Sequence, residues 1–192
     1  MISSVRHSIR PAIVVLAALT LITGFLYPLA VTAVAQIAFP GQANGSLITV
    51  NGTVVGSTLI GQTFDDPKYL WGRPSAAGAG YDANASSGSN LAPTSKKLID
   101  RVTAEVDRLR AANGDAPVPV ELVTTSASGL DPHVSPDAAR YQVARIAAAR
   151  GIAASDVQAA IDRHTDRPFL GLLGPDTVNV LLVNLDLDGT LR

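Results

Sequence analysis

Residues 11–39 read PAIVVLAALTLITGFLYPLAVTAVAQIAF, and this stretch decides the fold because it contains no charged side chain. As an α-helix its 29 residues would be roughly 43 Å long, whereas the hydrocarbon core of a bilayer is about 30 Å thick. Its polar members are few, namely Thr20, Thr23, Thr32 and Gln36. A core helix of a soluble protein would carry a polar face. The stretch therefore predicts one transmembrane helix, in which Pro28 removes a backbone donor.

The same stretch ends in small residues that look like a signal-peptide cleavage site. Ala33-Val34-Ala35 fits the A-x-A pattern, so a secreted binding protein released at Ala35 is an alternative. The apolar region of a signal peptide spans about 7–15 residues, and the run here is longer before it reaches Ala33. We therefore expect a retained membrane anchor.

The charges that flank the apolar stretch predict its orientation. Arg6, His7 and Arg10 precede it, and the next Lys or Arg is Lys68. Basic residues collect on the cytoplasmic side of a membrane helix. We expect a cytoplasmic tail at residues 1–10, the transmembrane helix at 11–39 and a soluble extracytoplasmic domain at 40–192.

The composition beyond the anchor limits the classes of function. Without Arg6 and Arg10 the 15 basic residues become 13, against 16 acidic residues, so the remainder has a formal charge of −3. This balance offers no basic surface for nucleic acid. The absence of cysteine excludes disulfides, thiolate metal sites and cysteine nucleophiles. About 150 residues suffice for one domain with its own core.

The region after the anchor begins with a hairpin signal and continues as a loop. LITV at residues 47–50 and TVVG at residues 53–56 flank Asn51-Gly52. Asn-Gly between two short β-branched segments is typical of a tight hairpin turn. Residues 64–93, which are rich in Gly, Ala, Ser, Asn and Pro, predict a long loop.

Three helices are predicted in the second half of the chain. Residues 94–114 place Leu98, Val102, Val106 and Leu109 on one helical face, with Gly114 as the stop. Ser135, Pro136 and Asp137 form a helix start, and this second helix is expected to run to Arg150 and stop at Gly151. Ser155 and Asp156 begin a third, which ends near His164 with Val157 and Ile161 facing inward.

Two further segments read as extended. Residues 120–125, VELVTT, follow two prolines that break the first helix. Residues 178–188, VNVLLVNLDLD, have the composition of a strand that is buried on both faces. The sequence thus predicts a single N-terminal transmembrane α-helix followed by one mixed α/β extracytoplasmic domain.

Common catalytic motifs are absent from the sequence. It contains no G-x-x-x-x-G-K-[ST], H-E-x-x-H or G-x-S-x-G. It also lacks the phosphorylatable D-K-T-G of ion-pumping ATPases, so the chain cannot hydrolyse ATP by that route.

One loop contains the residue types of a nucleophile triad. Apart from His7 on the tail, His133 and His164 are the histidines available for acid–base or metal chemistry. Asp131 and His133 follow Ser126 and Ser128 and would compose such a triad on paper, which leaves a membrane-anchored extracytoplasmic hydrolase as an alternative. The stronger interpretation is a hydrogen-bonded loop that caps the next helix. We expect no catalytic residue and no metal site.

Three blocks of sequence carry a family resemblance. They are WGRPSAAGAGYDANASSGSNLAPTS at residues 71–95, TSASGLDPHVSPDAARYQVARIAAARG at 125–151 and HTDRPFLGLLGPDTVNVLLVNLDLD at 164–188. Together with the N-terminal anchor, they resemble the C subunit family of the bacterial Kdp potassium-transporting ATPase. The resemblance covers nearly the whole chain.

This resemblance implies a non-catalytic accessory subunit of an ATP-driven potassium uptake complex. Its implied partners are a channel-like subunit that carries the ion and a P-type ATPase subunit that hydrolyses ATP. The family is credited with promoting assembly and activity, and with raising the ATP affinity of the ATPase subunit as a catalytic chaperone. We expect the outer domain to pack on the ion-carrying subunit near its entrance.

The resemblance also implies a nucleotide-associated loop. The Gln-Ser-Gly-Gly-Ser motif of the family falls on Ala85, Ser86, Ser87, Gly88 and Ser89, so Ser86, Ser87, Gly88 and Ser89 are the implied contacts for ATP held within the complex. Ala85 replaces the glutamine and Ser87 the first glycine. The Gly/Ser composition of residues 86–90 is itself suited to presenting backbone donors to a phosphate.

Overall fold

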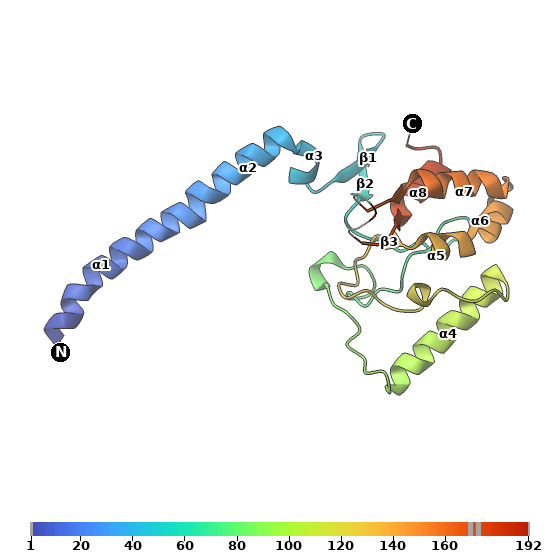
Figure 1. Cartoon of the computed structure of the whole chain (residues 1–192), viewed down its shortest axis with the longest axis horizontal. Coiled ribbons are helices and arrows are strands. Elements are labelled where there is room, and N and C mark those ends of the chain that lie inside the picture. Colours follow the sequence, from blue (N-terminus) through green and yellow to red (C-terminus); the bar gives the residue numbers. More distant parts are fainter. Residues whose placement is uncertain (1, 169–170, 172–173, 192) are drawn as a thin grey trace. The chain divides into compact units, whose positions relative to one another are not determined.

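The computed structural model describes residues 2–168, 171 and 174–191. The chain divides into two compact units, one up to Ser46 and the other from Leu47 onward. Figure 1 shows an N-terminal unit that is almost entirely helical and a C-terminal unit that contains both short strands and helices. We call the second unit the C-terminal domain.

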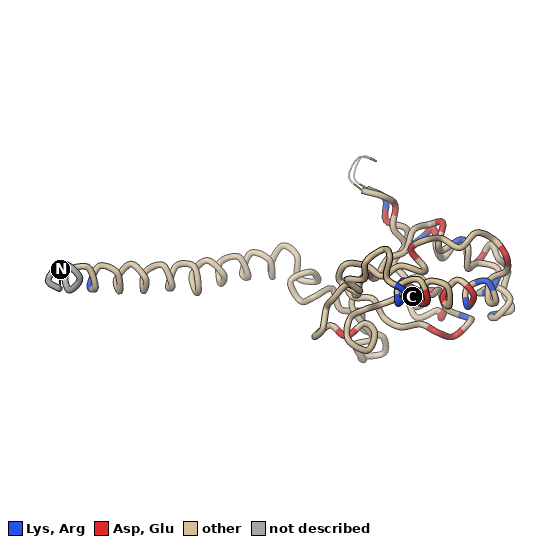
Figure 2. The backbone as a smooth tube through the Cα atoms, turned by 90° about the horizontal axis from the view of Figure 1, so that it is seen from below, with Lys and Arg blue, Asp and Glu red and all other residues tan. Residues whose placement is uncertain are grey.

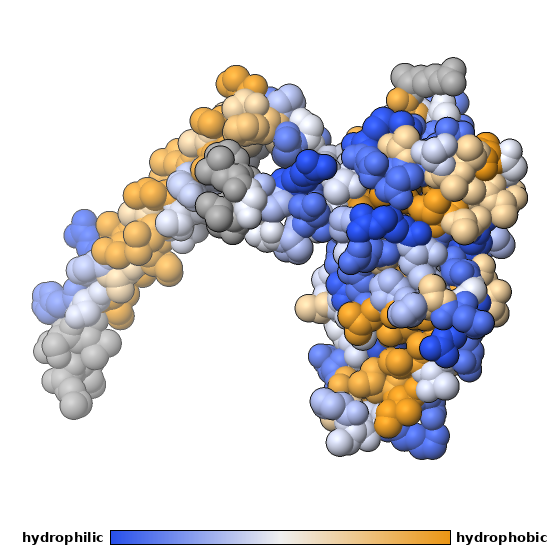
Figure 3. Space-filling view, turned by 45° about the vertical axis from the view of Figure 1, so that its right-hand side comes forward, coloured by the Kyte–Doolittle hydropathy of each residue, from blue (hydrophilic) through white to orange (hydrophobic). Residues whose placement is uncertain are grey.

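The N-terminal unit is one long helix. Helix α1 (Ile2–Leu21) continues through a π-helical turn, η1 (Ile22–Leu26), into α2 (Tyr27–Ala38). The part from His7 to Ala38 is long and apolar enough to cross a membrane. Figure 2 shows no charged residue along it beyond its N-terminal end, and hydrophobic side chains cover it in Figure 3. The predicted N-terminal apolar helix is therefore present, with the length that a membrane span requires.

The π-helical turn ends two residues before Pro28. The N–H of Tyr27 donates to the carbonyl of Ile22, five residues back. Pro28 has no N–H with which to continue the ladder, and a single π turn is a common way to accommodate such an interruption within an α-helix. The helix ends at Ala38, and the next residue, Phe39, precedes Pro40 and has a non-helical φ of −141°.

The C-terminal domain begins with the predicted hairpin. Strands β1 (Leu47–Val50) and β2 (Thr53–Ser57) pair antiparallel. Asn51 and Gly52 both have positive φ, 50° and 79°, as a two-residue type I′ turn requires. The hairpin prediction is confirmed.

A second sheet lies within the domain and has three very short strands. They are β3 (His133–Val134), β5 (Thr177–Asn179) and β4 (Thr165–Asp166), in the antiparallel order β3-β5-β4. The helices are α4 (Lys96–Asn113), α5 (Pro136–Tyr141), α6 (Val143–Arg150), α7 (Ala154–Arg163) and α8 (Val180–Leu187). The predicted mixed α/β domain is confirmed, and helices contribute most of its ordered structure.

The hydrophobic core joins the helices to the central strand β5. On α4, Leu109 is buried and Val102 and Val106 pack against the core, as the predicted apolar face requires. Val157 and Ile161 of α7 are fully buried. The core consists of Leu70, Trp71, Leu109, Leu122, Val123, Val134, Ala138, Ala139, Ile146, Ala147, Val157, Ala160, Ile161, Val178, Val180 and Val183.

Buried amide side chains hold the loop that contains Leu70 and Trp71. The amide of Asn184 accepts from the Leu70 N–H (2.7 Å) and donates to the Leu70 carbonyl (2.9 Å). Gln142 makes the same pair of bonds to Trp71, at 2.9 and 3.1 Å. Two amides thus take the place of a neighbouring strand, which satisfies backbone groups that burial would otherwise leave unpaired.

Arg145 fixes the same loop from α6. Its guanidinium donates to the carbonyls of Pro67 and Tyr69 and to Gln142 Oε1, and it lies 3.7 Å from the centroid of the Trp71 ring. Burial lowers the pKa of Arg145 to about 10, with the charge of Arg108 acting in the same direction. The group therefore stays protonated near neutral pH.

Three predicted elements differ from the structure. The strand predicted at 178–188 ends at Asn179, and Val180–Leu187 is helix α8. The side chain of Asn179 accepts from the Leu182 N–H (3.1 Å) and caps the helix. Because a short, largely apolar run fits a buried helix as well as a buried strand, its composition did not distinguish them.

The other two differences are a 3₁₀ turn at residues 120–122 and a break in the second predicted helix. The segment 120–125 is not extended, because Val120–Leu122 forms a 3₁₀ turn (η3), in which Val123 N–H donates to Val120 O. The helix predicted from Ser135 to Arg150 begins at Pro136 and is capped by Ser135 as expected. It is interrupted at Gln142, which separates α5 from α6.

Candidate functional site

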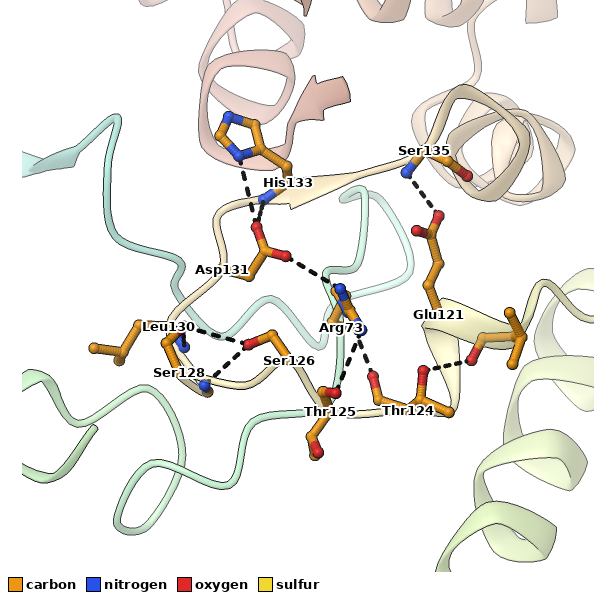
Figure 4. A network of polar contacts seen from close by, with 12 residues as sticks. Arg73, Glu121, Thr124, Thr125, Ser126, Ser128, Leu130, Asp131, His133 and Ser135 are labelled. Atoms are coloured by element: carbon orange, nitrogen blue, oxygen red, sulfur yellow. Dashed lines mark hydrogen bonds and ion pairs between the residues drawn. The ribbon is translucent and has the colours of Figure 1, made fainter. Parts of the chain in front are cut away.

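The predicted triad loop is organised by hydrogen bonds to its own backbone. Ser126 Oγ accepts from the Gly129 N–H (2.9 Å), and Ser128 Oγ accepts from the Leu130 N–H (3.1 Å). Figure 4 shows this loop with Asp131 and His133 beyond it. Both serine hydroxyls therefore shape the turn, as the loop interpretation predicts.

Asp131 is the electrostatic centre of this loop. Its carboxylate accepts from the backbone N–H of His133 (3.0 Å) and from Arg73 (3.2 Å). The remaining donors of Arg73 reach the carbonyls of Thr124 and Thr125 (Figure 4). Burial raises the pKa of Asp131, but the hydrogen bonds from His133 and the charge of Arg73 outweigh it and hold the pKa below its usual value.

The triad is not assembled in the part of the chain that the structure describes. His133 Nδ1 lies 3.6 Å from Asp131 Oδ1, and His133 Nε2 lies 3.5 Å from Asn179 Nδ2. No hydrogen bond joins either described serine hydroxyl, Ser126 or Ser128, to this imidazole, although a nucleophile needs its base within about 2.6–3.2 Å. The arrangement offers no activated nucleophile.

The Asp131 contacts predict a pH-dependent contribution to stability. Replacing Asp131 with Asn should lower the free energy of unfolding by about 1 kcal/mol at pH 7, the typical value of a hydrogen-bonded interaction. Because the folded-state pKa is depressed, the stabilisation is complete above the unfolded-state pKa, near 4, and is lost as the pH falls through the folded-state pKa. Urea unfolding at several pH values should show the two proteins converging in acid, and a constant difference would contradict this account.

His164 belongs to a separate ionic cluster. Its Nε2 lies 3.0 Å from Asp186 Oδ2, which Arg163 also contacts at 2.8 Å. Burial raises the pKa of Asp186, but the hydrogen bonds from Arg163 and His164 outweigh it and lower the pKa. The cluster joins the end of α7 to α8. Within residues 2–168, 171 and 174–191, no group of three His, Asp or Glu side chains is arranged to hold a metal ion.

The implied nucleotide loop packs directly on the triad loop. The backbone N–H of Ser87 donates to the carbonyl of Ser128 (2.9 Å), and the hydroxyl of Ser86 donates to the same carbonyl (3.0 Å). A Cβ at Gly88 would lie 3.0 Å from the carbonyl oxygen of Ala127. The glycine therefore allows two backbones to approach closely, and the N–H of Ser87 is already used within the protein.

Beyond this contact, Gly88 and Ser89 line a pocket of about 370 Å³. Two cations from the first turns of α4, Lys97 and Arg101, complete its wall, together with Ser75, Ala76 and Leu91. The Nε of Arg101 is buried and has no hydrogen-bond partner among the described residues. A basic pocket beside a Gly/Ser loop has the chemistry of an anion site.

Sequence reasoning identified the loop of this pocket but not its cations. Lys97 and Arg101 are four residues apart and therefore lie on one helical face. That spacing was visible in the sequence. What was not visible is the packing that brings the start of α4 against Gly88 and Ser89.

Comparison with known proteins assigns the chain to a family. The family model described as "KdpC: K+-transporting ATPase, c chain" matches residues 9–189. A relative from Sorangium cellulosum (strain So ce56) is 59% identical over 184 residues, which cover 94% of this chain and 97% of the relative. One from Rhodopseudomonas palustris (strain BisB5) is 54% identical, with 96% and 98% covered.

A third relative, from Myxococcus xanthus, is 56% identical over 191 residues, which cover 98% of this chain and 89% of the relative. All three carry the name potassium-transporting ATPase KdpC subunit. The similarity spans both the apolar helix and the C-terminal domain. The chain therefore belongs to the KdpC family and is an accessory subunit of the potassium uptake complex.

Proposed function

We propose that residues 11–39 are a retained anchor that holds the N-terminus in the cytoplasm and residues 40–192 outside the cell membrane. The observation that carries this proposal is the charge pattern around the apolar segment. Arg6, His7 and Arg10 precede it, and no residue from 11 to 64 is charged. Such an asymmetry favours insertion with the basic flank in the cytoplasm.

In this proposal the chain is non-catalytic and its partners do the chemistry. A P-type ATPase subunit hydrolyses ATP, and a channel-like subunit carries potassium. The C-terminal domain packs on the channel-like subunit near its entrance and promotes assembly and activity. The serine hydroxyls bound to their own loop backbone support this proposal, because the described hydroxyl, imidazole and carboxylate groups do not form a catalytic arrangement.

The orientation is tested by single cysteines, since the chain has none of its own. Val120 is 72% exposed in the C-terminal domain, and Ser3 lies in the predicted tail. A membrane-impermeant maleimide added to intact spheroplasts should label Val120→Cys and leave Ser3→Cys unlabelled until the membrane is opened. Labelling of Ser3→Cys alone from outside would indicate the opposite topology. A mature chain that lacks residue 3 would show that the apolar segment is cleaved.

A second proposal concerns nucleotide, and the pocket beside Gly88 and Ser89 supports it. Here the loop Ser86–Ser89 and the cations Lys97 and Arg101 contact the phosphates of ATP within the complex and raise the ATP affinity of the ATPase subunit. The buried, unpartnered Nε of Arg101 is the specific observation in its favour. A phosphate oxygen would supply the missing acceptor.

This nucleotide proposal predicts a change in the KM for ATP of the purified complex. Replacing Arg101 with Gln should raise that KM about tenfold, because a hydrogen bond to a charged group contributes about 1.5–3 kcal/mol. Lys96→Gln is the matched control, since Lys96 is 86% exposed and pairs with Asp100 (2.7 Å). An unchanged KM in both variants would contradict nucleotide binding at this pocket.

The two proposals make opposite demands on topology. A pocket that contacts cytoplasmic ATP must lie inside, whereas the charge pattern favours a C-terminal domain outside. The labelling and KM experiments therefore separate them. Labelling of Val120→Cys only from outside, combined with an unchanged KM for Arg101→Gln, would leave the assembly role as the function of the domain.

A further inference from the structure

The hairpin that opens the C-terminal domain exposes an apolar and uncharged face. Leu47 and Val54 are 56% and 55% exposed. The pairing register shifts between Ile48 and Thr49, but along β1 the exposed Leu47 and Thr49 alternate with the half-buried Ile48 and Val50. Thr49 pairs with Val54 across the hairpin, so Leu47, Thr49 and Val54 lie on the same side of the two strands. We call these three residues the outer hairpin face. No charged side chain occurs in residues 11–64, so none flanks this face along the chain.

The connection between the membrane helix and this hairpin is short and folded. After α2, helix α3 (Pro40–Ala43) adds one turn. The side-chain amides of Asn44 and Gln36 then donate to each other, at 3.1 and 3.2 Å. Asn44 also donates to the Pro40 carbonyl (2.7 Å). The connection is therefore tied back to the last turns of the apolar helix.

This connection limits how far the hairpin can lie from the membrane. Leu47 follows Asn44 by three residues, so their Cα atoms are at most about 11 Å apart. Gln36, the partner of Asn44, is two residues before the end of α2 at Ala38. The headgroup region adds about 5–8 Å on each side of the hydrocarbon core. The start of the hairpin is thus within reach of that region.

We propose that the outer hairpin face contacts the lipid headgroup region of the bilayer. Its leucine and valine side chains bury apolar area at the acyl boundary, and its threonine hydroxyl meets the polar headgroups. The absence of charge removes the cost of desolvating ionised groups at this depth. The short connection and the composition of the face are the same on either side of the membrane, so the proposed contact does not depend on the proposed orientation or partners.

Site-directed fluorescence in a bilayer tests this contact. Full-length Val54→Cys, labelled with an environment-sensitive fluorophore, is placed in nanodiscs of phosphatidylcholine and phosphatidylglycerol. A matched control is Val120→Cys, an exposed valine in the same domain but outside the hairpin. We expect blue-shifted emission at position 54 and severalfold stronger quenching there by lipids that carry a nitroxide on the headgroup.

Two results would overturn the proposal. The first is equal, weak lipid quenching at positions 54 and 120 in the nanodiscs. The second is a probe at position 54 that, in the assembled complex in the same nanodiscs, is shielded from water but not quenched by lipid. That result would identify a protein partner on this face. Persistent lipid quenching in the complex would support the lipid contact.

Discussion

Replacing Arg145 with alanine is expected to lower the free energy of unfolding of the C-terminal domain by about 3–4 kcal/mol. The guanidinium is largely buried and donates to Asn113 Oδ1 (3.0 Å), to Gln142 Oε1 (2.7 Å) and to the carbonyls of Pro67 and Tyr69. Alanine would remove this donor from Asn113 Oδ1 and the two carbonyls, and would leave Gln142 Oε1 with the N–H of Trp71. It would also remove the cation that lies over the Trp71 ring.

The measurement is urea unfolding of the full chain in mild detergent, followed by the fluorescence of its single tryptophan, Trp71. Arg145→Lys keeps the charge but lacks the planar guanidinium that donates to several acceptors at once. Its loss of unfolding free energy should therefore lie between those of the unaltered protein and Arg145→Ala. Arg140→Ala is the surface control, because Arg140 is exposed and pairs with Asp137 within α5; its effect should stay below about 1 kcal/mol. Equal losses for Arg145→Ala and Arg140→Ala would contradict the role of Arg145.

Removing the C-terminal domain should have the largest functional effect. A chain that keeps residues 1–46 but lacks residues 47–192 retains the whole apolar helix. If the domain promotes assembly from outside, growth at limiting potassium should fall to the level of cells without the chain. Arg140→Ala, which keeps the domain intact, should support growth like the unaltered protein.

The deletion distinguishes the domain from the anchor. Unchanged potassium uptake with an intact complex would assign the role to the helix alone and contradict a function for the domain. Loss of uptake with normal amounts of the truncated chain in the membrane would show that the anchor is present but insufficient. Immunodetection of the truncated chain in isolated membranes supplies that control.

The elements with strong local signals could be predicted from the sequence. Asn51-Gly52 specified its hairpin because both positions need positive φ. Gly114 and Gly151 ended α4 and α6 for a similar reason, with φ 88° and 66°. These signals depend on the backbone of a few neighbouring residues, so no distant contact was needed to recognise them.

Two features that the sequence did not predict involve distant contacts. Gln142 interrupts the predicted second helix, and its side chain pairs with Trp71, 71 residues away. Asn184 lies on the buried side of α8, where its side chain pairs with Leu70, 114 residues away. Periodicity cannot reveal such partners, because a buried amide looks like a polar interruption until its backbone partner is known.

The candidate site shows the same division. The Gly/Ser composition of Ser86–Ser89 marked the loop, but Lys97 and Arg101 reach it only through the packing of α4. The predicted triad loop was correctly interpreted as a hydrogen-bonded turn, since Ser126 and Ser128 carry local signals. The sequence thus located both loops, but the structure was needed to show that Lys97 and Arg101 lie beside Gly88 and Ser89.

This chain is expected to work as a subunit with specific partners, and co-purification is the sharpest test of that role. The full chain, tagged at its C-terminus, is isolated from membranes in mild detergent, and the proteins that accompany it are identified by mass spectrometry. We expect a channel-like potassium-carrying subunit and a P-type ATPase subunit among them, together with potassium-stimulated ATPase activity. Isolation of the intact chain alone, with both other subunits present in the same membranes, would contradict it.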